Sequence, residues 1–155
     1  MAPTADDGGY WLVASDGGIF AFGDAAFHGS MGGHPLNSPV VGIAVDRATG
    51  GYWEVAADGG IFAFDAPFLG STGSIALRQP VVGMAATADN AGYWFVAADG
   101  GLFAYGDAGF AGSAGGSPIP APIVGMAPDW STGGYWLLGR DGSVYAYGAP
   151  FAGSD

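Results

Sequence analysis

Two charged residues interrupt a segment that recurs four times along this chain. Glu54 is the only glutamate, and it occupies a strand position that holds Leu or Phe in the other copies. Arg140 stands where the other copies have Ser or Ala. A buried carboxylate is costly unless it is paired, so Glu54 is expected to be solvated or to contact an arginine. The two charges fit a ligand clamp, a pair between two chains, or chance substitutions in an edge repeat.

Trp130 is the one tryptophan outside the recurring segment, and it lies in an expected loop beside Asp129. A loop indole next to a carboxylate is the type of platform on which the face of a sugar stacks. The same indole could instead cover the end of a ring of sheets or contact a partner chain. The candidate ligand-binding residues are therefore Trp130, Asp129, Glu54 and Arg140.

Metal binding finds little support in the spacing of the polar residues. His28 and His34 lie six residues apart at positions that vary between copies, and a metal site needs a third donor. Both histidines are therefore expected to be exposed. One aspartate recurs in every copy, at Asp16, Asp58, Asp99 and Asp141. Calcium is conceivable there, but Asp before Gly at a hairpin is explained as well by turn formation, so no cofactor is expected.

No catalytic constellation can be assembled from these residues. The serines and aspartates stand in turn contexts. A two-carboxylate glycosidase would have to combine Glu54 with an aspartate, and nothing in the spacing supports such a pair. The chain has no Cys, which excludes a thiolate metal site and a disulfide framework. The sequence therefore predicts a protein that is not an enzyme.

The elements that position these residues come from an internal repeat. The tryptophans at 11, 53, 94 and 136 are spaced by 42, 41 and 42 residues. Each is the third residue of one copy of an aromatic segment, and the copies are Gly9–Phe22, Gly51–Phe64, Gly92–Tyr105 and Gly134–Tyr147. A fixed period near forty residues is typical of a repeat architecture. The repeat units are 1–42, 43–83, 84–125 and 126–155, of which the last is incomplete, and together they form a single domain.

Each unit is expected to form four short strands. Alternating aromatic and β-branched residues, separated by Asp-Gly turns, indicate strands near 10–14, 19–22, 27–30 and 40–45. A four-stranded unit repeated every 40–45 residues, apolar on both faces, is typical of a β-propeller blade. The fold prediction is therefore an all-β propeller of four repeats. A β-hairpin solenoid and a β-trefoil are alternatives, although the trefoil needs three repeats and the solenoid a shorter unit.

The aromatic side chains are expected to pack blade against blade. The repeated tryptophans Trp11, Trp53, Trp94 and Trp136 should occupy equivalent buried positions. Tyr10, Phe20, Phe22, Phe27 and their counterparts are also expected to lie mostly in the core. An edge strand at either end of the chain would leave sheet edges open. Two chains could then share one ring of eight blades, or copies could join end to end.

The composition restricts the possible partners. A net charge of −11 repels phosphate backbones and anionic lipid headgroups, which argues against nucleic-acid and membrane-surface partners. Neutral glycans, cationic groups or calcium would be tolerated. No apolar run has the length of a membrane span, and the N-terminus lacks the plan of a signal peptide. If the protein is exported, its signal is not in this chain.

The repeat resembles one found in tandem in secreted multidomain proteins of high-GC Gram-positive bacteria. The residues that carry this likeness are Gly9–Ser30, Pro39–Ile43, Pro80–Ala85 and Gly92–Phe103. The segment Pro39–Asp46 is also similar to NHL-type propeller blades. The Asp-Gly-Gly hairpins are similar to the Asp-box of sialidase-like propellers, without its Ser. The resemblance implies an extracellular location and a propeller-like fold.

These observations predict a non-catalytic extracellular module that binds a polysaccharide or another cell-surface component. A structural or oligomerising scaffold, whose partner is its own next copy, is the first alternative. A sialidase-like or lyase-like propeller enzyme is the second. The close similarity of the units favours several equivalent weak sites that act together over a single active site.

Overall fold

The computed structural model describes residues 1–154, which form twelve strands and no helix. The strands make four antiparallel sheets of three strands each. Sheet 1 contains β1 (Ala2–Pro3), β2 (Gly9–Val13) and β3 (Ile19–Gly23), and sheet 2 contains β4 (Val40–Val45), β5 (Tyr52–Ala56) and β6 (Ile61–Phe64). Sheet 3 contains β7 (Val81–Ala86), β8 (Gly92–Ala97) and β9 (Leu102–Gly106), and sheet 4 contains β10 (Ile123–Asp129), β11 (Gly134–Gly139) and β12 (Val144–Tyr147). The all-β prediction is confirmed.

The recurring aspartate closes the hairpin between the second and third strand of every sheet. In sheet 2 the carboxylate of Asp58 accepts a hydrogen bond from the amide of Gly60 at 2.9 Å. Gly59 between them has a φ of +78°, a conformation that glycine adopts without steric cost. The same bond is formed by Asp16, Asp99 and Asp141. The structure thus confirms a turn-forming role for these four residues.

The fourth strand predicted near 27–30 is not formed, so each sheet has three strands. Gly29 has a φ of +132°, which takes the backbone out of the β region. The segment is held by a side chain of the next sheet instead of a strand ladder. The hydroxyl of Tyr52 donates to the carbonyl of Gly29 at 2.6 Å and accepts from the amide of His28 at 3.1 Å. Equivalent pairs of bonds are made by Tyr93 and Tyr135.

Consecutive sheets stack through a repeated pair of aromatic rings. Each tryptophan on the second strand of one sheet packs against the tyrosine on the second strand of the next, with ring centroids 5.4–5.7 Å apart. The three pairs are Trp11 with Tyr52, Trp53 with Tyr93, and Trp94 with Tyr135. Each pair lies in a hydrophobic cluster shared by two neighbouring sheets. The core of this molecule is therefore divided into three layers between four sheets.

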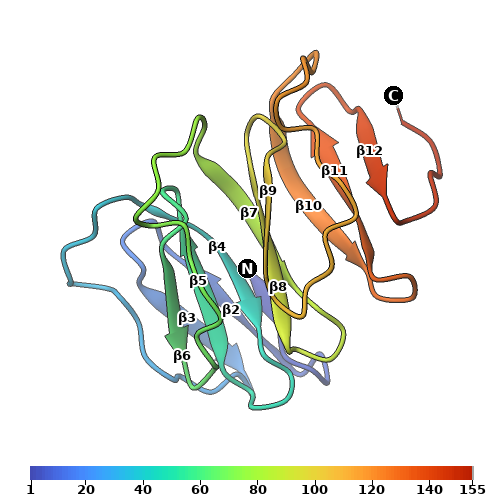
Figure 1. Cartoon of the computed structure of the whole chain (residues 1–155). Coiled ribbons are helices and arrows are strands. Elements are labelled where there is room, and N and C mark those ends of the chain that lie inside the picture. The colour runs from blue at the N-terminus through green and yellow to red at the C-terminus, as the bar shows by residue number, and fades with distance from the viewer. Residues whose placement is uncertain (155) are drawn as a thin grey trace.

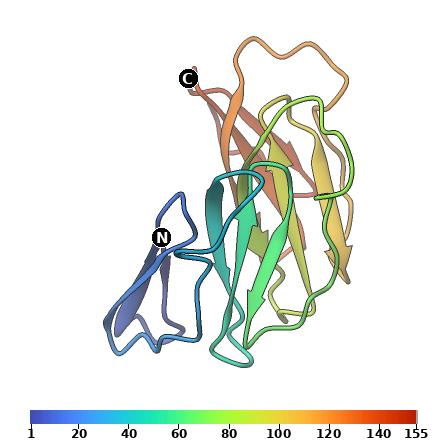
Figure 2. The same ribbon diagram turned by 90° about the vertical axis from the view of Figure 1, so that its left-hand side faces the viewer.

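The four sheets form an open arc, with sheet 1 and sheet 4 at its ends (Figures 1 and 2). Within residues 1–154, no hydrophobic cluster joins sheet 4 back to sheet 1. Trp11, Trp53 and Trp94 are buried as predicted, but the prediction for Trp136 is wrong, because this ring is only half-buried. Trp136 faces away from sheet 3, and no other sheet formed by the described residues covers it.

Candidate functional site

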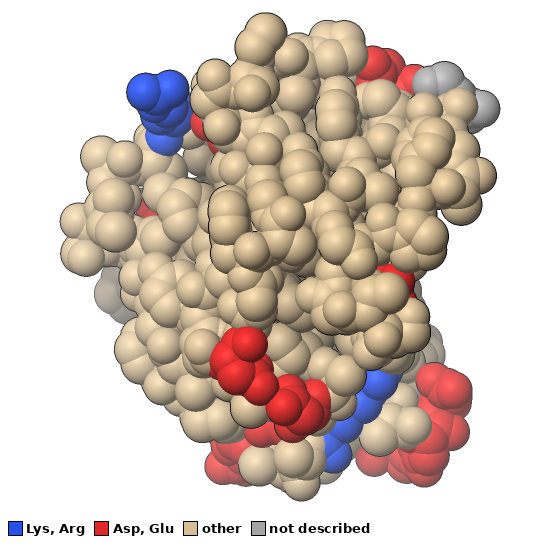
Figure 3. Space-filling model, turned by 45° about the vertical axis from the view of Figure 1, so that its right-hand side comes forward, with Lys and Arg blue, Asp and Glu red and all other residues tan. Residues whose placement is uncertain are grey.

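The candidate site is a groove on the rim formed by the turns between the first and second strands of sheets 3 and 4. It has a volume of about 450 Å³, and its lining includes Thr87, Asp89, Trp94, Asp107, Asp129 and Trp130. Figure 3 shows that acidic side chains visible on one face of the molecule gather mainly at its lower edge, where Figure 1 places these turns. The groove is therefore acidic, and its wall includes the exposed indole of Trp130 and the buried indole of Trp94.

Asp129 shapes the turn that presents Trp130. Its carboxylate accepts hydrogen bonds from the amide and hydroxyl of Ser131, at 3.0 and 2.6 Å, and from the hydroxyl of Thr132 at 2.8 Å. These bonds, the one from the Ser131 hydroxyl first, lower the pKa of Asp129. The Asp129 carbonyl also accepts from the amide of Gly133 at 2.9 Å. Most of the hydrogen-bonding capacity of this carboxylate is used within the turn, so Asp129 is a positioning residue.

Trp130 is held in place on one side and open on the other. Its indole N–H donates to the carbonyl of Ala86 at 3.3 Å, and the guanidinium carbon of Arg47 lies 4.1 Å from the ring centroid, a cation–π contact. The amide of Arg47 in turn donates to the side chain of Asn90 at 3.1 Å. The residue is nevertheless 50% exposed. Arg47 does not line the groove, so the indole reaches the groove with part of its surface free.

Trp130 also borders a second cavity, at the ends of the innermost strands. This hub cavity has a volume of about 270 Å³, and residues of all four sheets line it, among them Ala2, Ile43, Ala85 and Pro128. Arg47 and Asn90 are the hydrogen-bonding side chains on its wall, together with Thr87. The indole of Trp130 therefore separates an apolar cavity at the centre of the arc from the acidic groove on its rim.

Two carboxylates in the groove share one threonine hydroxyl. The hydroxyl of Thr87 lies 2.9 Å from Asp89 and 3.3 Å from Asp107, and its single proton can be donated to only one acceptor at a time. The hydrogen bond from the amide of Ala91 is the main cause that lowers the pKa of Asp89. Partial burial, and then the neighbouring Asp89, raise the pKa of Asp107. The pair leaves carboxylate oxygens that can accept hydrogen bonds from a ligand.

A second groove with the same plan lies between sheets 1 and 2, at positions 83 residues earlier in the chain. It has a volume of about 310 Å³, and its lining includes Thr4, Asp6, Trp11, Asp24, Arg47 and Thr49. The hydroxyl of Thr4 again lies between two carboxylates, 2.9 Å from Asp6 and 3.2 Å from Asp24. In this groove the position of Trp130 is held by Arg47. The two grooves therefore share their acidic pair and differ in the residue beside it.

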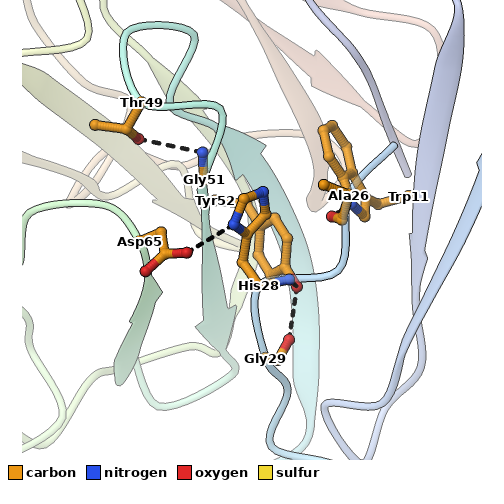
Figure 4. Close-up of polar contacts among 8 residues, drawn as sticks. All are labelled: Trp11, Ala26, His28, Gly29, Thr49, Gly51, Tyr52 and Asp65. Carbon is orange, nitrogen blue, oxygen red and sulfur yellow. Dashed lines mark hydrogen bonds and ion pairs between the residues drawn. The ribbon is translucent and has the colours of Figure 1, made fainter. Parts of the chain in front are cut away.

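His28 lines the second groove. The prediction that it is exposed is wrong. Its ring is half-buried, packs on Tyr52 with centroids 5.6 Å apart, and contacts Asp65 at 2.7 Å. Figure 4 shows the imidazole beside Asp65, while the hydroxyl of Tyr52 points to Gly29. His34 is exposed, as predicted. Among residues 1–154, no three His, Cys, Asp or Glu side chains gather closely enough to hold a metal ion.

Glu54 and Arg140 are not brought together by the fold. Glu54 is fully buried in β5, and neither of its carboxylate oxygens has a hydrogen-bond partner. Burial, and then the charge of Asp16, raise the pKa of Glu54 to about 8. Arg140 is exposed where β11 turns toward β12. The structure therefore shows no clamp made of these two residues within one chain, and Glu54 meets no arginine.

One recurring aromatic residue was expected in the core and is found on the surface. The phenylalanine that opens each Phe-X-Gly-Ser segment is 61–64% exposed, at Phe27, Phe68, Phe110 and Phe151. The sequence suggested a strand here, in which an aromatic side chain would pack on a neighbour. Because the segment is not a strand, its phenylalanine points away from the stacked sheets. The regular recurrence of Gly two residues after each Phe is a sequence signal that could have identified these positions.

The comparisons with known proteins identify no family for this chain. It matches none of the protein-family models against which it was compared, and no curated protein is similar to it. Among the residues that the structure describes, there is also no helix long and apolar enough to cross a membrane. The function must therefore be inferred from the grooves and the exposed faces themselves.

Proposed function

We propose that this chain is a non-catalytic binding module that acts outside the cell and holds a neutral polysaccharide in its rim grooves. Its four sheets are blades of a propeller-like arc, and the turns at one end of the blades form the binding surface. The observation that carries this proposal is the half-exposed Trp130 beside the Asp89 and Asp107 pair. The extracellular location follows from the resemblance to repeats of secreted proteins.

The groove contains an aromatic ring and hydrogen-bond acceptors, the two kinds of group that commonly bind a sugar. The face of an indole carries negative charge, which attracts the weakly positive C–H groups on one face of a sugar ring. Arg47 fixes the orientation of Trp130, so less freedom is lost when a ligand binds. Asp89 and Asp107 can accept hydrogen bonds from sugar hydroxyls. With a net charge of −11, the chain repels anionic sugars, so the proposed ligand is a glycan without negative charge.

The repetition of the groove supports binding over catalysis. Thr87, Asp89 and Asp107 correspond to Thr4, Asp6 and Asp24 in the second groove, with the same hydrogen bonds. An active site is normally formed once and carries polar groups that its neighbours lack. Two related weak sites, of which only the first contains the exposed indole, can instead strengthen each other on a long polymer, because binding at one raises the local concentration at the other.

Replacing Trp130 is expected to remove most of the binding with little effect on stability. On an array of neutral glycans, Trp130→Ala should lower the affinity at least about tenfold, which corresponds to about 1.4 kcal/mol. Phe151→Ala is a matched control, because it removes an aromatic ring of similar exposure that does not line the groove. Its affinity should stay within about twofold of the original chain. A preference for anionic glycans, or equal affinities of the two variants, would rule out this site.

A further inference from the structure

The outer face of sheet 1 is an exposed apolar surface. It consists of Tyr10 and Leu12 on β2 and Phe20 and Phe22 on β3, which are 38–55% exposed. The residues at the position of Tyr10 in the other sheets, Tyr52, Tyr93 and Tyr135, are fully buried against the preceding sheet. Sheet 1 therefore presents the surface that in sheets 2 to 4 receives a neighbour. This surface is named the tyrosine face.

The outer face of sheet 4 is the surface that, in sheets 1 to 3, packs on the next sheet. It consists of Trp136 and Leu138 on β11 and Val144 and Ala146 on β12. Leu138 is 45% exposed, whereas Val55 and Val96 at the same position in sheets 2 and 3 are fully buried. The indole of Trp136 is already oriented, because its N–H donates to the carbonyl of Pro150 at 2.8 Å. This surface is named the tryptophan face.

The three contacts inside the chain show how these faces would fit. In each contact the tryptophan of one sheet packs on the tyrosine of the next, and the tyrosine hydroxyl donates to a glycine carbonyl at 2.6 Å. The acceptor glycines have φ values of +132° to +136°. Gly153 has a similar φ of +121°, and among residues 1–154 its carbonyl has no partner. The hydroxyl of Tyr10 has no partner there either.

We infer that the tryptophan face of one copy docks on the tyrosine face of a second copy, in the geometry of the three internal contacts. Trp136 then packs on Tyr10, and the hydroxyl of Tyr10 donates to the carbonyl of Gly153. The contact is head-to-tail, so it closes into a ring or extends into a chain of copies. The high negative charge opposes this association, and salt relieves the repulsion. The inference does not depend on glycan binding.

Two charge substitutions test the contact, one on each face. Leu12→Asp places a charge on the tyrosine face, and Leu138→Asp places one on the tryptophan face. Both positions are already partly exposed, so folding should persist, which near-ultraviolet circular dichroism can check. In sedimentation at increasing concentration and salt, the original chain should exceed its monomer mass of 15.4 kDa. Each variant alone should remain at the monomer mass.

A mixture of the two variants gives the decisive result. The Leu12→Asp variant keeps an intact tryptophan face, and the Leu138→Asp variant keeps an intact tyrosine face, so an equimolar mixture should form dimers that cannot extend. Ile75→Asp, on an exposed loop residue outside both faces, should associate like the original chain. A monomeric original chain at high salt and concentration would overturn the inference. So would association that survives either substitution alone, because two like faces would then be in contact.

Discussion

Replacing Trp53 with alanine is expected to lower the free energy of unfolding by about 3–5 kcal/mol, the usual cost of removing a large buried aromatic side chain. Trp53 is fully buried between sheets 2 and 3, where it packs on Tyr93 with ring centroids 5.4 Å apart. Its indole N–H also donates to the carbonyl of Pro67 at 2.7 Å. The substitution would leave a cavity in the middle layer of the core, and chemical denaturation followed by circular dichroism measures the loss.

Trp136→Ala is the matched control for this prediction. Trp136 has the same position in its sheet and the same kind of hydrogen bond, to the carbonyl of Pro150 at 2.8 Å, but within residues 1–154 no second sheet packs on its ring. Its replacement should cost clearly less, on the order of 1 kcal/mol, because less apolar surface is buried. The comparison is made at low protein concentration, where copies are separate. Equal losses for the two variants would contradict the stacking of consecutive sheets as the source of stability.

Replacing Glu54 with glutamine is expected to remove a fall in the free energy of unfolding with rising pH. Most carboxylates in folded proteins have the opposite effect, because their pKa is lowered on folding. The folded chain keeps the proton of Glu54 up to a pKa of about 8, whereas the unfolded chain releases it near 4.5. Between these values the folded state binds more protons than the unfolded state, so stability falls as pH rises, by up to about 1.4 kcal/mol per pH unit. Between pH 5 and pH 8 the loss is on the order of 3 kcal/mol.

The stability of the Glu54→Gln variant should change little over this range, because glutamine does not ionise. Glu54→Leu, which introduces the residue found at this position in sheets 1 and 4, should be more stable than the original chain throughout. Any pH dependence of stability that the two variants share with the original chain belongs to groups other than Glu54. A pH dependence that is unchanged in Glu54→Gln would show that Glu54 is solvated or paired in solution.

Much of the fold could be predicted from the local pattern of residues. The second and third strands of every sheet follow from their recurring aromatic and aliphatic residues, and the hairpins between them follow from Asp-Gly. The segment at Phe27 was misjudged, because its aromatic residue and its glycine give opposite signals. Its conformation is decided by the hydroxyl of Tyr52, which belongs to the next sheet and lies 23 residues beyond Gly29. A contact of this kind depends on how the sheets stack, and the local pattern does not reveal it.

The candidate site could be predicted only in part, for a similar reason. Trp130 and Asp129 were identified because they depart from the repeat and are adjacent in the sequence. Asp89 and Asp107 were not identified, because a turn of sheet 3 and the end of β9 come together only in the folded chain. The complete burial of Glu54 was also unexpected. The sequence around Glu54 does not show that the hairpin at Gly17, in the neighbouring sheet, covers its carboxylate.

Mapping a bound sugar onto the chain tests the proposed function most directly. The ¹⁵N-labelled chain can be titrated with neutral oligosaccharides of the cello-, chito- and manno- series, while the indole N–H signals of its five tryptophans are followed by NMR. Trp130 is expected to shift most, together with the amides of Ala91 and Ser131, and the signals of Trp53 and Trp136 should stay in place. A sugar that shifts other indoles and leaves Trp130 unchanged would contradict the assignment of this groove as the binding site.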